Sequence, residues 1–169
     1  AEGFYLLKRS RGMTFMELLC GVLILVMSTA LVLVGVNLAL TTYRANMEAS
    51  EAQVLYSTLT TVISDKLRYC GTVETAEDGT ITQIFAQGIG TGSGEAFQLT
   101  EDGKVMLGGK SLGSGAYPRD LTVSSLTMTY NKDSRLFTVS MEISNQKGQR
   151  LAGGMDFQVK KLNTSESDI

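Results

Sequence analysis

The clearest pattern along the chain is a long run of apolar residues near its start. No Asp, Glu, Lys or Arg occurs from Leu18 to Tyr43. A helix that crosses the hydrocarbon core of a bilayer needs about 20 predominantly apolar residues. A buried core helix is the alternative, but a soluble protein of this size has no core wide enough to hide all sides of such a helix. The run therefore predicts a helix that spans a membrane.

The charges on either side of this run predict its orientation. Lys8, Arg9 and Arg11 precede it, whereas a single Arg44 and then the acidic Glu48 follow it. An excess of Lys and Arg marks the cytoplasmic flank of a membrane helix. We therefore expect a single-pass protein of the cell membrane with its C-terminal part outside the cytoplasm. A cleaved secretory signal fits less well, because its apolar region usually has about 7 to 15 residues.

Beyond the apolar run, the pattern becomes that of an amphipathic helix. Apolar residues recur at helical spacing with charged residues between them, at Met47, Leu55, Leu59, Val62, Ile63 and Leu67. No Gly or Pro interrupts the stretch from Val36 to Cys70, and Gly71 stands where a C-terminal cap belongs. One helix from Met13 to Cys70 would be about 85 Å long. The rest of the chain is too short to cover it, so we expect its first half to project into lipid or against other copies.

After Gly71 the apolar residues follow the period of two that is typical of β-strands. Two hairpins with acidic, glycine-ended turns are predicted, pairing 72–75 with 80–86 and 97–100 with 104–107. Three longer strands are predicted to form an antiparallel meander, 121–130, 135–144 and 150–160. The meander has one apolar face, and the amphipathic helix is the only long element available to cover it. The predicted fold class is therefore α+β, a long N-terminal helix packed on an antiparallel sheet.

The composition narrows the chemistry that is open to this chain. It has no histidine and a formal net charge of −2. Histidine is the commonest general base and zinc ligand, so we expect a protein that is not an enzyme and uses no cofactor. Asp102, Asp120 and Asp133 do not have the spacing of oxygen ligands around a metal ion, so no metal site is predicted. Cys20 and Cys70 lie too far apart on one straight helix to form a disulfide.

Basic residues are concentrated in the predicted meander, which makes nucleic-acid binding an alternative to weigh. They are Lys132, Arg135, Lys147, Arg150, Lys160 and Lys161. Acidic residues are interspersed among them, and charges in the loops between strands usually serve solubility. DNA therefore stays an alternative partner rather than the expected one.

Glu17 is the residue that a simple membrane anchor does not explain. It lies at the start of the apolar run, five residues after Gly12. An ionised carboxylate at membrane depth costs several kcal/mol unless it has a partner. One interpretation is that Lys8, Arg9 or Arg11 reaches it at the level of the lipid headgroups. The other is that Glu17 has a function and finds its partner on another molecule.

The residues around Glu17 resemble the prepilin leader motif of type IV pilins and type II secretion pseudopilins. That motif is a short basic leader ending in glycine, then an apolar residue, threonine, two apolar residues and glutamate, followed directly by a membrane helix. In this chain it reads Lys8-Arg9-Ser10-Arg11-Gly12-Met13-Thr14-Phe15-Met16-Glu17. The resemblance implies that prepilin peptidase cuts between Gly12 and Met13 and that Met13 becomes the N-methylated terminus. It also implies that Glu17 directs assembly by pairing with the terminal amine of a neighbouring subunit.

The same resemblance implies a pilin-like fold in three parts. Residues 1–12 would be the leader, 13–43 the transmembrane and filament-core half of the helix, and 44–169 the globular domain, with the helix continuing to about residue 70. The chain would be a structural subunit, a minor pilin or a pseudopilin, of a type IV pilus, a type II secretion system or a competence pseudopilus. Its partners would be prepilin peptidase, other pilin or pseudopilin subunits, the membrane and the pilus assembly platform. After assembly it would lie at the cell surface or in the pilus.

The residues alone leave a second function open. A single-pass, membrane-anchored binding module outside the cytoplasm would also have the apolar run and the sheet, with Glu17 incidental to its function.

Overall fold

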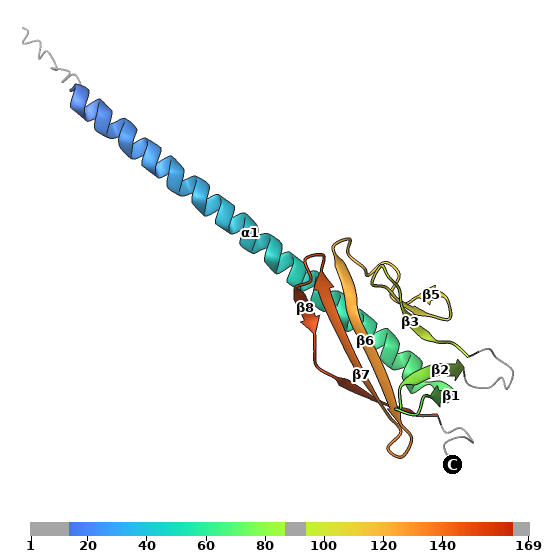
Figure 1. The fold of residues 1–169 in the computed structure, drawn as a ribbon. Helices are drawn as coiled ribbons and strands as arrows, with labels where there is room; N and C mark the ends of the chain where they lie inside the picture. The colour runs from blue at the N-terminus through green and yellow to red at the C-terminus, as the bar shows by residue number, and fades with distance from the viewer. Residues whose placement is uncertain (1–13, 87–93, 164–169) are drawn as a thin grey trace, which may run out of the picture. The chain divides into compact units, whose positions relative to one another are not determined.

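The computed structural model describes residues 14–86 and 94–163, and within them it contains one helix and nine strands. The chain divides into two compact units, Ala1–Arg44 and Ala45–Ile169. Helix α1 (Phe15–Arg68) begins in the first unit and ends in the second. All nine strands belong to the second unit (Figure 1). One long helix followed by antiparallel strands confirms the predicted α+β fold class.

In the second unit, α1 buries one stripe of small and apolar side chains. The fully buried residues are Ala52, Leu55, Leu59, Ile63 and Leu67. Their spacing of three and four residues places them on one side of the helix. The prediction was wrong for Met47, which is 44% exposed. Met47 lies five residues before Ala52, and this separation turns it about 140° around the helix from the buried stripe.

The C-terminus of α1 differs from its prediction. The helix ends at Arg68, and Gly71 lies inside strand β1 (Cys70–Thr75), where it is buried, so it is not a helix cap. The last carbonyl groups of the helix are bonded instead by residues from the other end of the chain. The backbone N–H of Leu162 donates to the carbonyl oxygen of Arg68 at 3.0 Å. The side-chain amide of Asn163 donates to the carbonyl oxygen of Tyr69 at 2.8 Å.

Both predicted hairpins are confirmed. Strand β1 pairs with β2 (Ile81–Ala86), and β3 (Phe97–Leu99) pairs with β4 (Val105–Leu107). A short strand that was not predicted, β5 (Lys110–Ser111), pairs with the other edge of β4. Gly108 and Gly109 form the two-residue turn between them with φ of 55° and 77°, the left-handed conformation that glycine adopts most readily.

The predicted meander is present as a four-stranded antiparallel sheet with one difference. Strand β6 (Leu121–Asn131) pairs with β7 (Leu136–Asn145), as expected. The third predicted strand is broken into β8 (Arg150–Gly153) and β9 (Phe157–Lys160), and both pair with β7. The break follows from Gly153 and Gly154, whose φ angles of 88° and 84° are left-handed and end the extended conformation.

A β-bulge explains how β6 buries its apolar residues. Leu121 and Val123 are buried at odd positions, whereas Met128 and Tyr130 are buried at even positions. The register of β6 against β7 shifts between Val123 and Ser125. The extra residue reverses the alternation of side chains, so that apolar residues on both sides of the bulge face the core.

The two hairpins are held against the free edge of β6 through their turns. The N–H of Val123 donates to the carbonyl oxygen of Gly103, and the N–H of Tyr130 donates to that of Gly79, both at 2.9 Å. Gly103 has a φ of 69°, and a Cβ at this position would collide with the side chain of Thr122. Glycine therefore permits both the turn and its close approach to β6.

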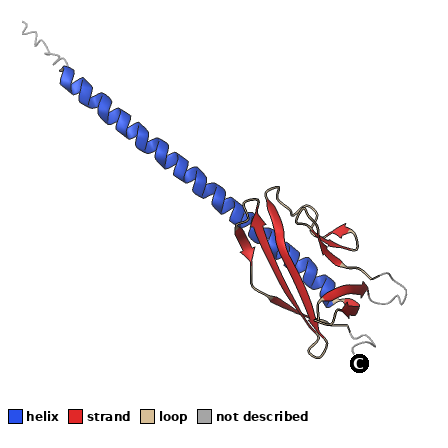
Figure 2. Cartoon of the chain, viewed as in Figure 1, coloured by secondary structure: helices blue, strands red, loops and turns tan. Residues whose placement is uncertain are grey.

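Helix α1 and the strands of the second unit share one hydrophobic core. The buried stripe of α1 packs in a single cluster with β7, from which Phe137, Val139, Met141 and Ile143 are fully buried. Strands β6 and β7 cross over this part of α1 (Figure 2). The cover that the sequence predicted for the apolar face of the sheet is therefore confirmed.

Candidate functional site

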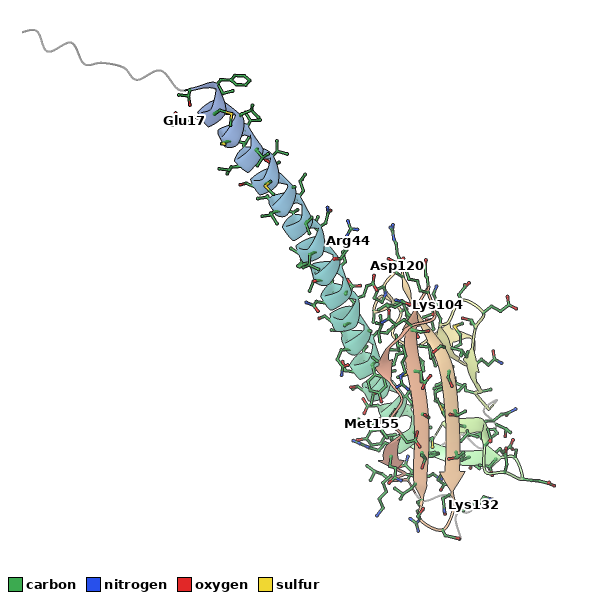
Figure 3. The ribbon with its side chains drawn as sticks, turned by 60° about the vertical axis from the view of Figure 1, so that its left-hand side comes forward. Glu17, Arg44, Lys104, Asp120, Lys132 and Met155 are labelled. Atoms are coloured by element: carbon green, nitrogen blue, oxygen red, sulfur yellow. The ribbon has the colours of Figure 1, made fainter. Side chains whose placement is uncertain are left out.

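The predicted cleavage and methylation residues, Gly12 and Met13, lie outside the described residues. Glu17 is described and lies in the first turn of α1 (Figure 3). Its side chain is exposed, as are all residues from Thr14 to Met47 within the chain. The structure therefore shows the surroundings of only one of the three predicted site residues.

Thr14 caps the N-terminus of α1. It precedes the first helical residue, Phe15, and its side-chain hydroxyl accepts a hydrogen bond from the backbone N–H of Glu17 at 3.3 Å. Its carbonyl oxygen accepts the N–H of Leu18 at 3.1 Å. Threonine followed three residues later by glutamate is the sequence pattern of a capping box, in which both side chains bond orphan N–H groups of the first turn. The capping role of Thr14 was not predicted, although this sequence pattern indicates it.

Glu17 thus has a favourable local position that does not depend on a partner molecule. Negative charge in the first turn interacts favourably with the helix dipole. This contribution amounts to roughly 0.3–1 kcal/mol at an exposed position. It is smaller than the cost of about 2.5–3.5 kcal/mol for placing a charged residue at the centre of a membrane helix. The capping position therefore explains why a glutamate is tolerated at a helix start, but it does not offset burial in lipid.

The helix surface that follows Glu17 is apolar on every side and exposed within the chain. Large side chains that remain exposed include Phe15, Leu19, Leu25, Leu31, Val34 and Leu38. None of the most apolar stretch of α1 is buried within the chain, whereas the core helix of a soluble protein is mostly buried. Helix α1 is thus long and apolar enough to span a membrane, as predicted for this part of the chain.

Three hydroxyl side chains in this segment bond to the helix itself. The hydroxyls of Ser28 and Thr29 donate to the carbonyl oxygens of Ile24 and Leu25, each at 2.8 Å. Thr41 donates in the same way to Asn37 at 3.0 Å. The hydroxyl donor is then already hydrogen-bonded to a carbonyl oxygen of its own helix, so these residues are compatible with lipid.

The apolar surface ends where charged residues return. Arg44 is the last residue of the first unit (Figure 3). Glu48 follows one turn later and is partly covered, with Asn145 donating to it at 3.5 Å. Asn145 also accepts the backbone N–H groups of Lys147 and Gln149, which fixes the turn between β7 and β8. This turn is thereby placed beside the first turns of α1 in the second unit.

Two of the basic residues in the meander interact with other side chains of the protein. Lys161 is only 2% exposed, and its ammonium group lies 6.0 Å from the centre of the Tyr130 ring. Arg150 forms an ion pair with Glu142 at 3.1 Å. Two of the six residues considered for DNA contact are therefore engaged within the protein.

Two side chains of the second unit have shifted pKa values for local reasons. A hydrogen bond from the N–H of Thr80 lowers the pKa of Asp78, which fixes the turn between β1 and β2. Burial raises the pKa of Tyr117 above its usual value of 10.0, and the N–H of Val105, which donates to its hydroxyl oxygen at 2.9 Å, partly opposes the shift. Among the described residues, no group of three or more His, Cys, Asp or Glu is placed to hold a metal ion.

No protein-family model, curated protein sequence or solved structure matches the chain.

Proposed function

We propose that this chain is a type IV pilin-like structural subunit, a minor pilin or a pseudopilin, that polymerises through the first half of α1. The observation that carries the proposal is a carboxylate at the very start of a helix that is compatible with lipid. Glu17 lies in the first turn of a segment that is apolar on all sides. The second half of the same helix is packed on antiparallel strands. This order of parts is the one that the resemblance to pilins implies.

Cleavage of the leader is linked to assembly through the charges near Glu17. Cutting between Gly12 and Met13 removes Lys8, Arg9 and Arg11 and creates a positive amine at Met13. Glu17 then has no basic residue nearby in its own sequence until Arg44. A carboxylate at membrane depth is stabilised by a positive partner. The terminal amine of a neighbouring subunit supplies that partner, so that adding a subunit to a filament relieves the cost.

Mass spectrometry of the protein isolated from its native host tests the proposal. We expect a chain that starts at Met13 and carries one added methyl group on its amine. Gly12→Val should prevent the cut, because a branched side chain then replaces the glycine of the motif. Protein that retains Lys8, Arg9 and Arg11 in assembled material would contradict the proposal.

An anchored binding module is the second candidate, and the observation that favours it is the place of Glu17 in the capped first turn of α1. Negative charge there interacts favourably with the helix dipole, so Glu17 has a use in a helix that never polymerises. The two functions differ in the mature N-terminus. An intact leader supports the anchored module, and a terminus at Met13 supports the pilin-like subunit.

A further inference from the structure

A cavity of about 350 Å³ lies beside the C-terminal end of α1 in the second unit. The proposed function assigns no role to the residues that line it. Its base is apolar, with Ile84 and Leu107 only 5% and 4% exposed. Tyr69 and Phe85 place two aromatic rings at its wall. The volume falls within the range of small-molecule sites and suits a ligand no larger than a side chain or a small organic molecule.

Two carboxylates line the same cavity, Asp65 from α1 and Glu95 from the segment before β3. Both are exposed, and neither forms an ion pair with any residue that the structure describes. Lys66 also lines the cavity. Its single positive charge leaves a net charge of about −1 around the opening at neutral pH.

The backbone of Glu95 is held in place by strand β2. Its N–H and its carbonyl oxygen are both bonded to Ile84, at 2.8 Å and 2.9 Å. Its side chain lies against Gly108, where an added Cβ would come within 2.9 Å of the carboxyl carbon. The absence of a side chain at Gly108 leaves room for the Glu95 side chain over the turn between β4 and β5. The backbone of Glu95 is fixed to β2 at the cavity, and its carboxylate stays exposed to solvent.

We propose that this cavity binds an organic cation on a short apolar stem, a guanidinium or ammonium group. The apolar base receives the stem, because burying it removes apolar surface from water. Tyr69 and Phe85 supply two aromatic rings to the lining, and an aromatic ring attracts a positive charge that lies over its face. Asp65 and Glu95 form charge-assisted hydrogen bonds with its N–H groups. Arginine and lysine side chains and free alkyl amines share this chemistry. The proposal does not depend on the pilin-like function.

The first test is a titration of the full chain in zwitterionic detergent micelles. The probes are butylguanidinium and its uncharged analogue butylurea, and the readout is the amide NMR signals of Ile84, Phe85 and Leu107. We expect saturable shifts with butylguanidinium and much weaker ones with butylurea. Equal shifts with the two probes, or no saturation with the cation, would overturn the proposal.

Removing a negative charge and removing the positive charge should change the affinity for butylguanidinium in opposite directions. Asp65→Asn and Glu95→Gln should each weaken butylguanidinium binding about threefold, the size expected for one partly exposed charge pair. Lys66→Gln should strengthen it by a similar factor, because it removes a repelling charge. Glu101→Gln, an exposed acid on another hairpin turn, is the matched control and should leave binding unchanged. Acid variants that bind as the wild type does would contradict the site.

A third set of probes separates the ring contribution and the source of the cation. Tyr69→Leu keeps an apolar wall without the ring. It should therefore weaken the binding of butylguanidinium but not the binding of butylurea. A blocked Gly-Arg-Gly peptide that binds more tightly than butylguanidinium would identify a protein side chain as the natural ligand. Binding of butylguanidinium alone would identify a free amine or guanidine. If Tyr69→Leu weakened the binding of both probes equally, the ring would contribute only apolar contact. That result would overturn the cation–π part of the proposal.

Discussion

Thr60 has the one buried side-chain oxygen in residues 14–86 and 94–163 that lacks a hydrogen-bond partner. Thr60→Val replaces this hydroxyl by a methyl group of similar shape and has little effect on helix propensity. We expect the free energy of unfolding of the full chain in micelles to rise by about 1 kcal/mol. Chemical denaturation measures the change. Thr60→Ser is the control, since it keeps the hydroxyl and loses the methyl group, and it should lower stability. A loss of stability in the valine variant would show that the hydroxyl has a partner.

Tyr117 gives a prediction that depends on pH. Tyr117→Phe leaves the N–H of Val105, a fully buried residue, without its hydrogen-bond acceptor. We expect a loss of about 1–3 kcal/mol in the free energy of unfolding at neutral pH.

The pKa of Tyr117 sets the pH dependence of this difference. Because that pKa is raised in the folded protein, the unfolded chain releases the proton first as the pH rises above about 10. The folded state then binds more protons than the unfolded state, so stability falls with rising pH in that window. The wild type should therefore lose more stability than Tyr117→Phe between about pH 9 and pH 11. Parallel losses in the two proteins would show that Tyr117 does not contribute to the decline.

The burial of single residues was predictable where an apolar side chain recurs at helical spacing. Leu55, Leu59 and Ile63 were assigned to the core by spacing alone, and all are fully buried. Ala52 was missed because alanine is common on either side of a helix. The burial of Lys161 was missed because a charged residue is buried only with suitable surroundings, which here include the Tyr130 ring on strand β6. Such surroundings are set by the fold and leave no local pattern.

At the scale of elements, the end of α1 shows how a distant segment replaces a local signal. Gly71 matched the sequence pattern of a cap, but Leu162 and Asn163 bond the last carbonyls instead. Asn163→Ala removes the donor to Tyr69 and should lower the free energy of unfolding by about 1 kcal/mol. Asn163→Asp should cost more, because a negative charge is unfavourable beside the C-terminal end of a helix. Thermal unfolding at neutral pH ranks the two variants. If aspartate were tolerated better than alanine, this capping contact would not operate.

The strands were predictable in position but not in detail. Alternation of apolar residues located β6 and β7, and acidic turns with glycine located both early hairpins. Interruptions were harder, because a bulge between Val123 and Ser125 changes only the phase of the alternation. Gly153-Gly154 and Gly108-Gly109 were the available signals for the break after β8 and for the turn before β5. Glycine pairs also occur in flexible loops, so their structural effect becomes clear only from the strands beside them.

At the scale of the whole molecule, the two units differ in whether the chain covers their apolar residues. The second unit buries the apolar stripe of α1 beneath a sheet, as a protein in water must. The first unit leaves its apolar helix uncovered by its own chain. The sequence could predict this contrast because the two halves of α1 have different apolar patterns. The first half is apolar throughout, and the second half is amphipathic. The predicted partners of the uncovered half lie on other molecules.

Glu17 allows the charge and the helix cap to be separated by mutation. Glu17→Gln keeps an amide that can serve in a capping box but removes the charge, whereas Thr14→Ala removes the cap and keeps the charge. If the charge pairs with the Met13 amine of a neighbour, Glu17→Gln and Glu17→Ala should both stay in the membrane and lose incorporation into filaments. Their residence in the membrane should equal or exceed that of the wild type, because a charge at membrane depth is removed.

The measurement compares the membrane and sheared-filament fractions of each variant in a host that has the full assembly machinery. Thr14→Ala should weaken the first turn by about 1 kcal/mol and still enter filaments, because the carboxylate remains. The reverse result, with the glutamine variant assembling and Thr14→Ala failing, would assign Glu17 to the helix cap. In that case the burial of a carboxylate would be a cost that the first turn tolerates, and the force that brings subunits together would have to come from the apolar surface of α1 alone.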